Sequence, residues 1–490
     1  MINKKPNIVL IVIDALRARN LGIYGYHKDT SPTIDTIGKE GVVFNNAYCC
    51  FNATDPSITS ILTGMYPLSH GILHHGFVSQ REVLEYYSRG IKNLAEILRP
   101  YGYTTIALDW LERWHKRGFD YYGYYGSSGM TLIKRLIKST INKLPKYTQK
   151  IITGILMNFY YKAKPYDAEK LTNHAINLIK KEVEKQKPFF IFIHYWDVHL
   201  PYNCPKDLKD KFIEEIPYSK KIDEILAKIK NEKWRKFLRE SLKGAKTTDD
   251  VIARYDGAIA HVDGNIGRLI DFLDKCGILD NTLLIITSDH GESLTEHDIY
   301  FDHHGLYDVS IHVPLIMRYP QKLPERRRIE GLVQHIDIVP TILDIINIRK
   351  RKNIDFDGKS MLPLIEGKIR EFRSVVFVEE SSAQRKRAIR TKGFKYIQSL
   401  SDENIAGTYY FGNHGVTKGK GVCKYCGFVH GDIEELYDLK KDPHELINVV
   451  NTECEIALKM RKMLHDIVIN LETMIEKRKI KRKCRLLTIG

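Results

Sequence analysis

Three apolar runs constrain the fold of this chain more than any other feature. They are residues 7–13 (NIVLIVI), 189–194 (FFIFIH) and 282–287 (TLLIIT). A run without regular polar alternation is typical of a strand that is buried on both faces, as in a parallel sheet covered by helices. Each run therefore predicts a central strand.

Acidic and imidazole side chains follow each of these runs. The residues concerned are Asp14 after the first run, Asp197 and His199 after the second, and Asp289 and His290 after the third. Open α/β sheets bind their ligands outside the carboxyl ends of the strands. Several such residues at one edge of a sheet predict a metal or catalytic site, whereas a single one could cap the next segment.

Segments with helical periodicity separate these runs, and a further apolar run at residues 104–108 predicts another strand. This alternation indicates an α/β fold, with a large, mostly parallel sheet and helices on both faces. We expect this domain to span residues 1–370, with insertions at about 110–165 and 205–250. Helices are expected at residues 91–98, 167–185 and 255–276, and as solvated helices within the second insertion.

The pattern changes beyond residue 370. Short strand-like runs follow one another without long helices between them, at residues 374–379, 394–398, 409–411 and 435–439. They predict a smaller antiparallel sheet, closed by a helix at about residues 453–475. Residues 371–490 are therefore expected to form an α+β subdomain that ends in a tail rich in Lys and Arg at residues 477–485.

The net charge of +16 points to anionic partners, or to a basic but solvated surface. A basic amphipathic segment at residues 132–144 could pack as a lid or lie on an anionic membrane surface. No run of about 18 apolar residues occurs, and no leader segment is recognisable. We therefore expect a cytoplasmic protein, or one that is peripheral to a membrane.

The 8 cysteines do not form a disulfide framework for a chain of 490 residues. One pair, Cys423 and Cys426, has the C-x-x-C spacing and lies near His414 and His430 in the sequence. A zinc-binding module is one interpretation of this pair, although no second C-x-x-C accompanies it.

Residues 52–64 (NATDPSITSILTG) carry a hydroxyl in front of a predicted helix. Asp55 is expected to be extended, because the proline that follows disfavours the helical region for its predecessor. Pro56 can open a helix at its first position. Thr54 would then stand just before a helix N-terminus, as a cap or as a nucleophile that faces an oxyanion.

Four short motifs occur along the chain in a fixed order. They are Asp14 with Leu21-Gly22-Ile23-Tyr24-Gly25, Thr54-Asp55-Pro56-Ser57 with Leu62-Thr63-Gly64, Ser288-Asp289-His290-Gly291-Glu292, and Glu435-Leu436-Tyr437-Asp438-Leu439. Together they resemble the motifs of the sulfatase family, within the alkaline-phosphatase-like superfamily. The resemblance spans nearly the whole chain, and it implies an alkaline-phosphatase-like fold and a metal-dependent ester hydrolase.

The chain departs from the family's pattern at the reactive positions. Thr54 stands where sulfatases have the Cys or Ser that is oxidised to formylglycine, and Ile58 replaces the signature arginine. Ala15 replaces a second aspartate, His290 an asparagine and His303 a lysine. These changes resemble the phosphodiesterase, phosphonate-ester hydrolase and phosphotransferase branches of the superfamily.

The resemblance implies one divalent cation and a covalent intermediate. The implied metal ligands are Asp14, Thr54, Asp289 and His290, the implied catalytic residues are Thr54, His199 and His303, and the implied substrate-binding residues are Asp197 and His304. An imidazole ligand favours Mn²⁺ or Zn²⁺ over Ca²⁺ or Mg²⁺. As in two-metal relatives, Asp197, His199, His303 and His304 could instead hold a second metal.

We therefore expect hydrolysis of phosphate mono- or diesters, or transfer of the phosphoryl group, through a covalent intermediate on Thr54. A sulfuric ester hydrolase of the arylsulfatase type is the alternative within the same class. A non-catalytic sulfatase-like binding protein is an alternative of another class, and the joint presence of Asp14, Thr54, Asp289 and His290 disfavours it. The expected partner is a small anionic ester, with an anionic lipid or glycan as acceptor if the group is transferred. No nucleic acid is expected.

Overall fold

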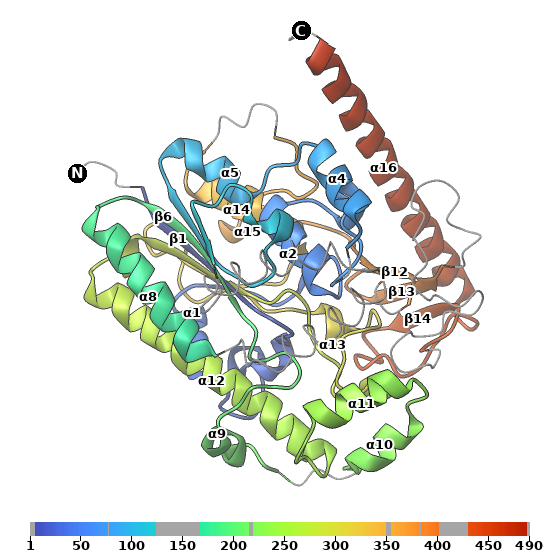
Figure 1. The fold of residues 1–490 in the computed structure, drawn as a ribbon. Coiled ribbons are helices and arrows are strands. Elements are labelled where there is room, and N and C mark those ends of the chain that lie inside the picture. The colour runs from blue at the N-terminus through green and yellow to red at the C-terminus, as the bar shows by residue number, and fades with distance from the viewer. Residues whose placement is uncertain are drawn as a thin grey trace, which may run out of the picture.

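The computed structural model describes residues 5–76, 78–123, 167–214, 219–348, 354–381, 384–400 and 430–487. Its main body is built on an eight-stranded sheet in the order β5-β4-β6-β1-β7-β8-β2-β9 (Figure 1). The strands are β1 (Asn7–Ile13), β2 (Val42–Phe44), β4 (Thr104–Leu108), β5 (Tyr121–Gly123), β6 (Phe189–Tyr195), β7 (Thr282–Thr287), β8 (Leu315–Arg318) and β9 (Arg327–Ile329). β3 (Ala47–Tyr48) and β10 (Val333–Gln334) form a separate parallel pair.

The predicted central strands are confirmed. β1 lies between β6 and β7 and pairs in parallel with both, with Ile11 opposite Ile193 and Ile286. β8 runs antiparallel to β7 and β2, so the sheet is mixed but mostly parallel. All residues of β1, β6 and β7 are buried, which explains why their sequences show no polar alternation.

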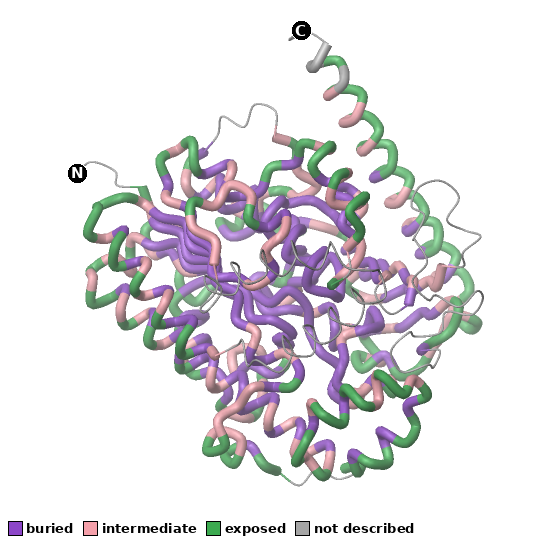
Figure 2. The backbone as a smooth tube through the Cα atoms, in the orientation of Figure 1, coloured by how far each residue is buried: buried purple, intermediate pink, exposed green. Residues whose placement is uncertain are grey.

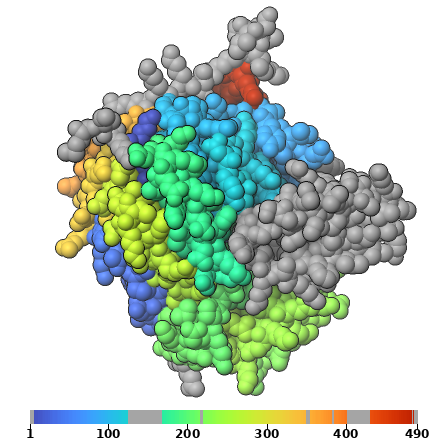
Figure 3. Space-filling view, turned by 60° about the vertical axis from the view of Figure 1, so that its left-hand side comes forward, coloured from blue at the N-terminus to red at the C-terminus, as the bar shows by residue number. Residues whose placement is uncertain are grey.

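Helices cover both faces of this sheet, as predicted. Val9 and Ile11 belong to the core that α1, α8 and α12 share, whereas Ile8 and Leu10 belong to the core that α2, α5 and α14 share. These helices are α1 (Pro32–Lys39), α2 (Thr54–Thr63), α5 (Leu94–Leu98), α8 (Ala168–Glu184), α12 (Thr248–Lys275) and α14 (Ile338–Ile345). The strands form the buried centre of the molecule (Figure 2), and α8 and α12 lie side by side on its outside (Figures 1 and 3).

Two predicted helices begin elsewhere than expected, because cap residues decide their starts. Asn93 caps α5 by accepting a hydrogen bond from the backbone N–H of Glu96, so the helix begins at Leu94. A capping box of Thr247 and Asp250 starts α12 well before the predicted residue 255.

The two insertions differ in how far the structure describes them. Residues 205–250 contain helices, as predicted: α9 (Lys206–Lys211), α10 (Ile222–Lys228) and α11 (Glu232–Ser241). Residues 110–165 are described as far as Gly123. The amphipathic segment 132–144, the strand predicted at 409–411, and His414, Cys423 and Cys426 lie outside the described residues. Among the helices that the structure describes, none has the length and apolar character of a membrane span.

The predicted C-terminal antiparallel sheet is confirmed, in the order β11-β12-β13-β14. Its strands are β11 (Val376–Glu380), β12 (Lys386–Arg390), β13 (Phe394–Ser399) and β14 (Glu434–Asp438). The helix α16 (Cys454–Leu487) packs its first half on this sheet through Ala457, Met460 and Leu464. It is longer than predicted, and residues 477–485 form its last turns, which project beyond the body in Figure 1.

One further helix of nine residues, α4, and several short helical turns complete the described structure. They are α3 (Pro67–His70), α4 (Gln80–Ser88), α13 (Asp308–Ile311), α15 (Leu362–Ile365), η1 (Ala18–Asn20), η2 (Gly22–Tyr24), η3 (Arg99–Tyr101), η4 (Arg113–Lys116), η5 (Leu279–Asn281), η6 (Glu296–Asp298) and η7 (His335–Asp337).

Candidate active site

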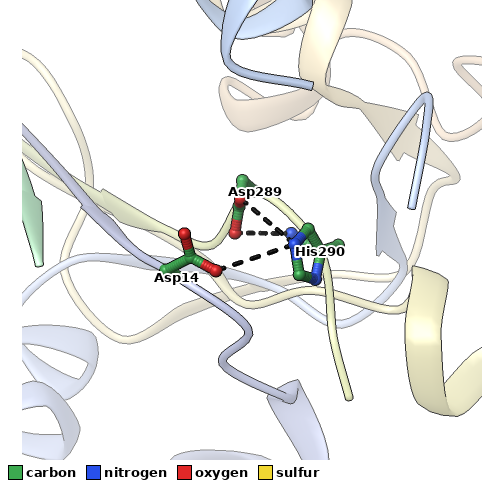
Figure 4. Close-up of side chains that lie close together, drawn as sticks. All are labelled: Asp14, Asp289 and His290. Atoms are coloured by element: carbon green, nitrogen blue, oxygen red, sulfur yellow. Dashed lines mark hydrogen bonds and ion pairs between the residues drawn. The ribbon is translucent and has the colours of Figure 1, made fainter. Parts of the chain in front are cut away.

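The carboxyl ends of β1 and β7 bring two aspartates together. Asp14 follows β1 directly, and Asp289 follows β7 after one serine. Asp289 Oδ1 accepts hydrogen bonds from the backbone N–H groups of Ala15 (3.2 Å) and His290 (2.9 Å). Figure 4 shows Asp14, Asp289 and His290 facing one another, and each offers a ligand atom within 4.8 Å of the others.

His290 presents an unprotonated nitrogen to the two aspartates. Its Nδ1 lies 2.8 Å from the backbone oxygen of Gly291, which is an acceptor, so Nδ1 carries the proton and Nε2 a lone pair. Nε2 is 3.3 Å from Asp289 Oδ2 and 3.6 Å from Asp14 Oδ1. Burial lowers the pKa of His290 to about 4, which also favours the neutral ring.

Three acceptor atoms therefore converge, and neither of the two carboxylate oxygens among them has a donor in the described part of the chain. Asp14 Oδ1 and Asp289 Oδ2 are buried and have no hydrogen-bond partner among the described residues. Unpaired buried carboxylate oxygens are costly, and burial raises the pKa of Asp289. A divalent cation would remove this cost, because carboxylate oxygens and imidazole nitrogens are its usual ligands. The donor set thus fits a divalent metal ion.

Thr54 stands beside these three acceptors, as the first residue of α2. Its Oγ1 is 3.5 Å from Asp14 Oδ2 and 3.4 Å from His290 Nε2. Ala53, and not Thr54, is the N-cap residue of α2, so the interpretation of Thr54 as a cap is wrong. The N-terminus of α2 adds positive potential that favours an anion at this place.

The prediction that Asp55 is extended is also wrong, because Asp55 lies in the first turn of α2. Its buried carboxylate accepts hydrogen bonds from Arg113 Nη2 (2.6 and 2.7 Å) and from the backbone N–H of Gly76 (2.8 Å). Pro56 costs no intrahelical bond here, because the first four N–H groups of a helix have no partner. Burial raises the pKa of Asp55, but His75 and Arg113 outweigh burial and bring it below its usual range.

A second histidine, His194, contacts the carboxylate of Asp14, and the sequence analysis missed it. His194 in β6 places Nε2 3.2 Å from Asp14 Oδ2 and Nδ1 2.8 Å from Oδ1 of Asp109, the residue after β4. All three side chains are wholly buried. Burial lowers the pKa of His194, but the hydrogen bond to Asp109 and the nearby carboxylate of Asp14 outweigh it and raise the pKa to about 10. The charged ring therefore holds Asp14 in place and offsets part of its charge.

Replacing His194 by glutamine is expected to weaken metal binding by about 10- to 100-fold, because partners of ligating side chains typically contribute that much. Calorimetric titration of metal-free protein with Mn²⁺ or Zn²⁺ measures the change. His174→Gln is the matched control, because its ring contacts the Tyr121 hydroxyl and no residue of the site. An unchanged affinity in His194→Gln would show that Asp14 needs no such support.

His199 and His303 line one side of the group. The ring of His303 stacks on that of His290 with centroids 4.1 Å apart, and the ring of His199 lies 5.8 Å from that of His303. His199 Nδ1 contacts the backbone oxygen of Leu200 (3.0 Å), and His303 Nδ1 contacts that of Asn52 (2.5 Å). Nε2 of His303 lies 3.9 Å from Asp302 Oδ1, beyond hydrogen-bond distance, so both rings keep Nε2 for another partner.

Asp197 and His304 have their contacts elsewhere. Asp197 Oδ1 accepts a hydrogen bond from the backbone N–H of Ala168, at the start of α8 (3.2 Å). His304 Nδ1 lies 3.2 Å from Asp302 Oδ2, and its ring centroid lies 4.7 Å from that of His430. These contacts tie Asp197 to the helix layer and His304 to the segment before β14, the last strand of the C-terminal sheet.

The structure does not bring together the four residues proposed for a second metal. In the part of the chain that the structure describes, metal-ligand spacing of three or more side chains occurs at Asp14, Asp289 and His290 alone. The four residues of the alternative set, Asp197, His199, His303 and His304, do not form such a group.

Comparison with known proteins identifies the family of this site. The Sulfatase family matches residues 6–348, and the family of the N-sulphoglucosamine sulphohydrolase C-terminal region matches residues 295–413. An arylsulfatase of Clostridium perfringens is 26% identical to this chain, over 92% of this chain and 91% of that protein.

Solved structures share the fold. BT4656, in complex with its substrate D-glucosamine-2-N,6-O-disulfate, gives a TM-score of 0.68 at 21% identity and covers 96% of this chain and 99% of its own. The phosphonate monoester hydrolase of Agrobacterium radiobacter gives a TM-score of 0.63 at 20% identity, over 96% of both chains. With the family match over most of its length and this shared fold, the chain belongs to the sulfatase family.

Proposed function

We propose that this chain is a metal-dependent hydrolase of sulfuric or phosphoric esters that uses the Thr54 hydroxyl as its nucleophile. The observation that carries the proposal is the position of Thr54 Oγ1, within 3.5 Å of Asp14 Oδ2 and His290 Nε2 at a helix N-terminus. The unpaired buried acceptors beside a buried hydroxyl support a reactive metal site more than a non-catalytic protein.

Asp14, Asp289 and His290 would hold the cation, with Thr54 Oγ1 completing the set. A bound divalent cation would lower the pKa of the Thr54 hydroxyl and neutralise charge on the ester group. The imidazole ligand supports Mn²⁺ or Zn²⁺ over Ca²⁺ or Mg²⁺.

Thr54 Oγ1, after losing its proton, attacks the sulfur or phosphorus atom in line with the leaving oxygen. The first half-reaction leaves the transferred group on Thr54, and water releases it in the second, so one difficult displacement becomes two easier ones. The N-terminus of α2 stabilises charge that develops on the non-bridging oxygens. His199 and His303 offer Nε2 atoms beside the ring of His290, where they could contact the oxygens of the ester.

Relatives support a sulfuric ester as the first candidate substrate. They include an arylsulfatase and a N-acetylglucosamine-6-O-sulfatase of Bacteroides thetaiotaomicron, and the fold is shared with an enzyme solved with a disulfated glucosamine. A sulfated sugar is therefore the substrate class that we propose first.

A phosphoric ester is the second candidate, and Thr54 is the observation that favours it. The hydroxyl of a threonine cannot give the formylglycine that a sulfatase of the usual kind carries, but it can accept a phosphoryl group directly. A phosphonate monoester hydrolase also shares the fold. Transfer of the group to a glycan or lipid hydroxyl would use the same first half-reaction.

Two esters of the same leaving group separate the candidates. We expect the Mn²⁺-loaded protein to hydrolyse 4-nitrophenyl sulfate with a kcat/KM about tenfold or more above that for bis(4-nitrophenyl) phosphate, equivalent to about 1.4 kcal/mol in the transition state. Release of 4-nitrophenol measures both rates. The reverse ranking would assign phosphoric esters, and no turnover of either would contradict the hydrolase proposal.

A further inference from the structure

The carboxylate of Asp55 is held rigidly one residue from the nucleophile. Arg113 Nη2 contacts both of its oxygens, at 2.6 and 2.7 Å, and the backbone N–H of Gly76 donates to Oδ2 at 2.8 Å. The Asp55 side chain is wholly buried, whereas that of Arg113 is partly exposed. A buried carboxylate beside a reactive hydroxyl, fixed by three donor contacts, can orient a further group.

His75 is the group that Asp55 orients. Its Nδ1 lies 3.1 Å from Asp55 Oδ2, and the backbone N–H of Asp55 is 3.3 Å from the same nitrogen. Because Nδ1 is engaged, Nε2 is the ring nitrogen that remains for another partner. The side chain is 20% exposed, so a ligand can reach it.

His75 also lies at the start of the helix that carries the nucleophile. Its Nδ1 contacts both the backbone N–H and the carboxylate of Asp55, the residue after Thr54 in the first turn of α2. Its backbone belongs to a different segment, between α3 and α4, so the imidazole reaches the N-terminus of α2 from another part of the chain.

The partner of Nδ1 distinguishes His75 from His199, His290 and His303. His194 also has a carboxylate at Nδ1, but its Nε2 faces the carboxylate of Asp14. In His199, His290 and His303, Nδ1 faces a backbone carbonyl oxygen. In His75 it faces a carboxylate. A carboxylate beside Nδ1 holds the ring in one orientation and leaves Nε2, on the opposite side of the ring, to work as acid and base.

We propose that His75 is the catalytic acid that protonates the leaving oxygen of the ester, with Asp55 and Arg113 as its positioning residues. This role rests on the proposed hydrolase function. As the bond from Thr54 Oγ1 to sulfur or phosphorus forms, the bond to the leaving oxygen breaks. The electron pair of the broken bond goes to that oxygen, and the proton on His75 Nε2 makes it an alcohol.

The second half-reaction returns the proton. Water attacks the group carried by Thr54, one of its protons passes to His75 Nε2, and the Thr54 oxygen leaves with the electron pair of its bond. That oxygen then takes back from solvent the proton that it released to solvent before its attack. The sum is one ester and one water converted to one alcohol and one acid anion. The enzyme returns to its starting state without any other reactant.

The test compares two leaving groups in His75→Gln. For a phenyl ester, whose leaving oxygen is basic and needs a proton, kcat/KM is expected to fall about 100-fold. For the matching 4-nitrophenyl ester, whose leaving group departs readily as an anion, the fall is expected to stay below about threefold. Added imidazole should restore part of the phenyl ester rate in His75→Ala. A role in holding the loop alone would lower both rates equally.

His74→Gln is the matched control, because the neighbouring His74 also bonds a carboxylate through Nδ1, that of Glu82 at 2.8 Å in α4. It should leave both rates unchanged, and all variants should keep the metal content and thermal midpoint of the wild type. An equal loss for the two esters, or no loss for the phenyl ester, would overturn the role of His75 and leave the hydrolase function standing. No turnover of either ester by the wild type would overturn both.

Discussion

Replacing Thr54 by alanine is expected to lower kcat/KM by about 10³-fold or more, because the nucleophile is lost while the remaining groups only bind the ester. Folding should change little. Thr54 makes no helix-capping bond, and the loss of a buried methyl group, about 1 kcal/mol, is offset in part by the better helix propensity of alanine. Metal content should stay complete, because Asp14, Asp289 and His290 remain. Steady-state kinetics and elemental analysis measure the two quantities.

Thr54→Ser is the control, because it keeps a hydroxyl at the same place and should retain turnover. A covalent intermediate adds a mass equal to the transferred group to the peptide that contains Thr54, and this addition should be absent from Thr54→Ala. Near-normal turnover in Thr54→Ala would remove Thr54 from the chemistry and leave a direct attack by water.

The positions of Asp14 and Asp289 could be predicted from the sequence, because both residues follow the ends of central strands. Residues 7–13 and 282–287 are so uniformly apolar that only a doubly buried strand accommodates them, and both form central strands with these bounds. Asp14 and Asp289 then had to meet, because β1 and β7 are parallel neighbours and end at the same edge. The order of the motifs along the chain added Thr54, which no local pattern distinguishes from a cap.

The part that could not be predicted depends on contacts between distant segments. His194 ends an otherwise apolar run, and this was its only signal; its partners Asp109 and Asp14 come from two other strands. Asp55 took a helical conformation against the preference of a residue before proline, because Arg113 and Gly76 hold its carboxylate. β12 was missed because its sequence, KRAIR, is mostly charged. The prediction for α16 ended too early, because its last turns have no apolar periodicity; they are helical because Lys and Arg are good helix formers.

Replacing Asp289 by asparagine is expected to change metal binding and stability in opposite directions. The metal should be lost, because the ligand set loses a charged oxygen. The metal-free protein should become more stable, by about 1–3 kcal/mol, because an amide N–H would replace the unpaired Oδ2 and could donate to His290 Nε2, 3.3 Å away. The two N–H groups that Oδ1 accepts from keep their partner. Elemental analysis and urea unfolding of chelator-treated protein measure the two effects.

The pH dependence of unfolding also tests whether the buried Asp289 carboxylate destabilises the metal-free protein. Burial raises the pKa of Asp289, so the metal-free folded protein binds a proton there more tightly than the unfolded chain does. Its free energy of unfolding should therefore fall as the pH rises through and above the ordinary range of an aspartate, and Asp289→Asn should remove this contribution. Asp298→Asn, on the exposed turn of the following loop, is the control and should alter neither metal content nor this slope. A full metal complement in Asp289→Asn, or a metal-free protein made less stable by the change, would mean that the acceptors at the end of β1 and β7 are paired in some other way than by a cation.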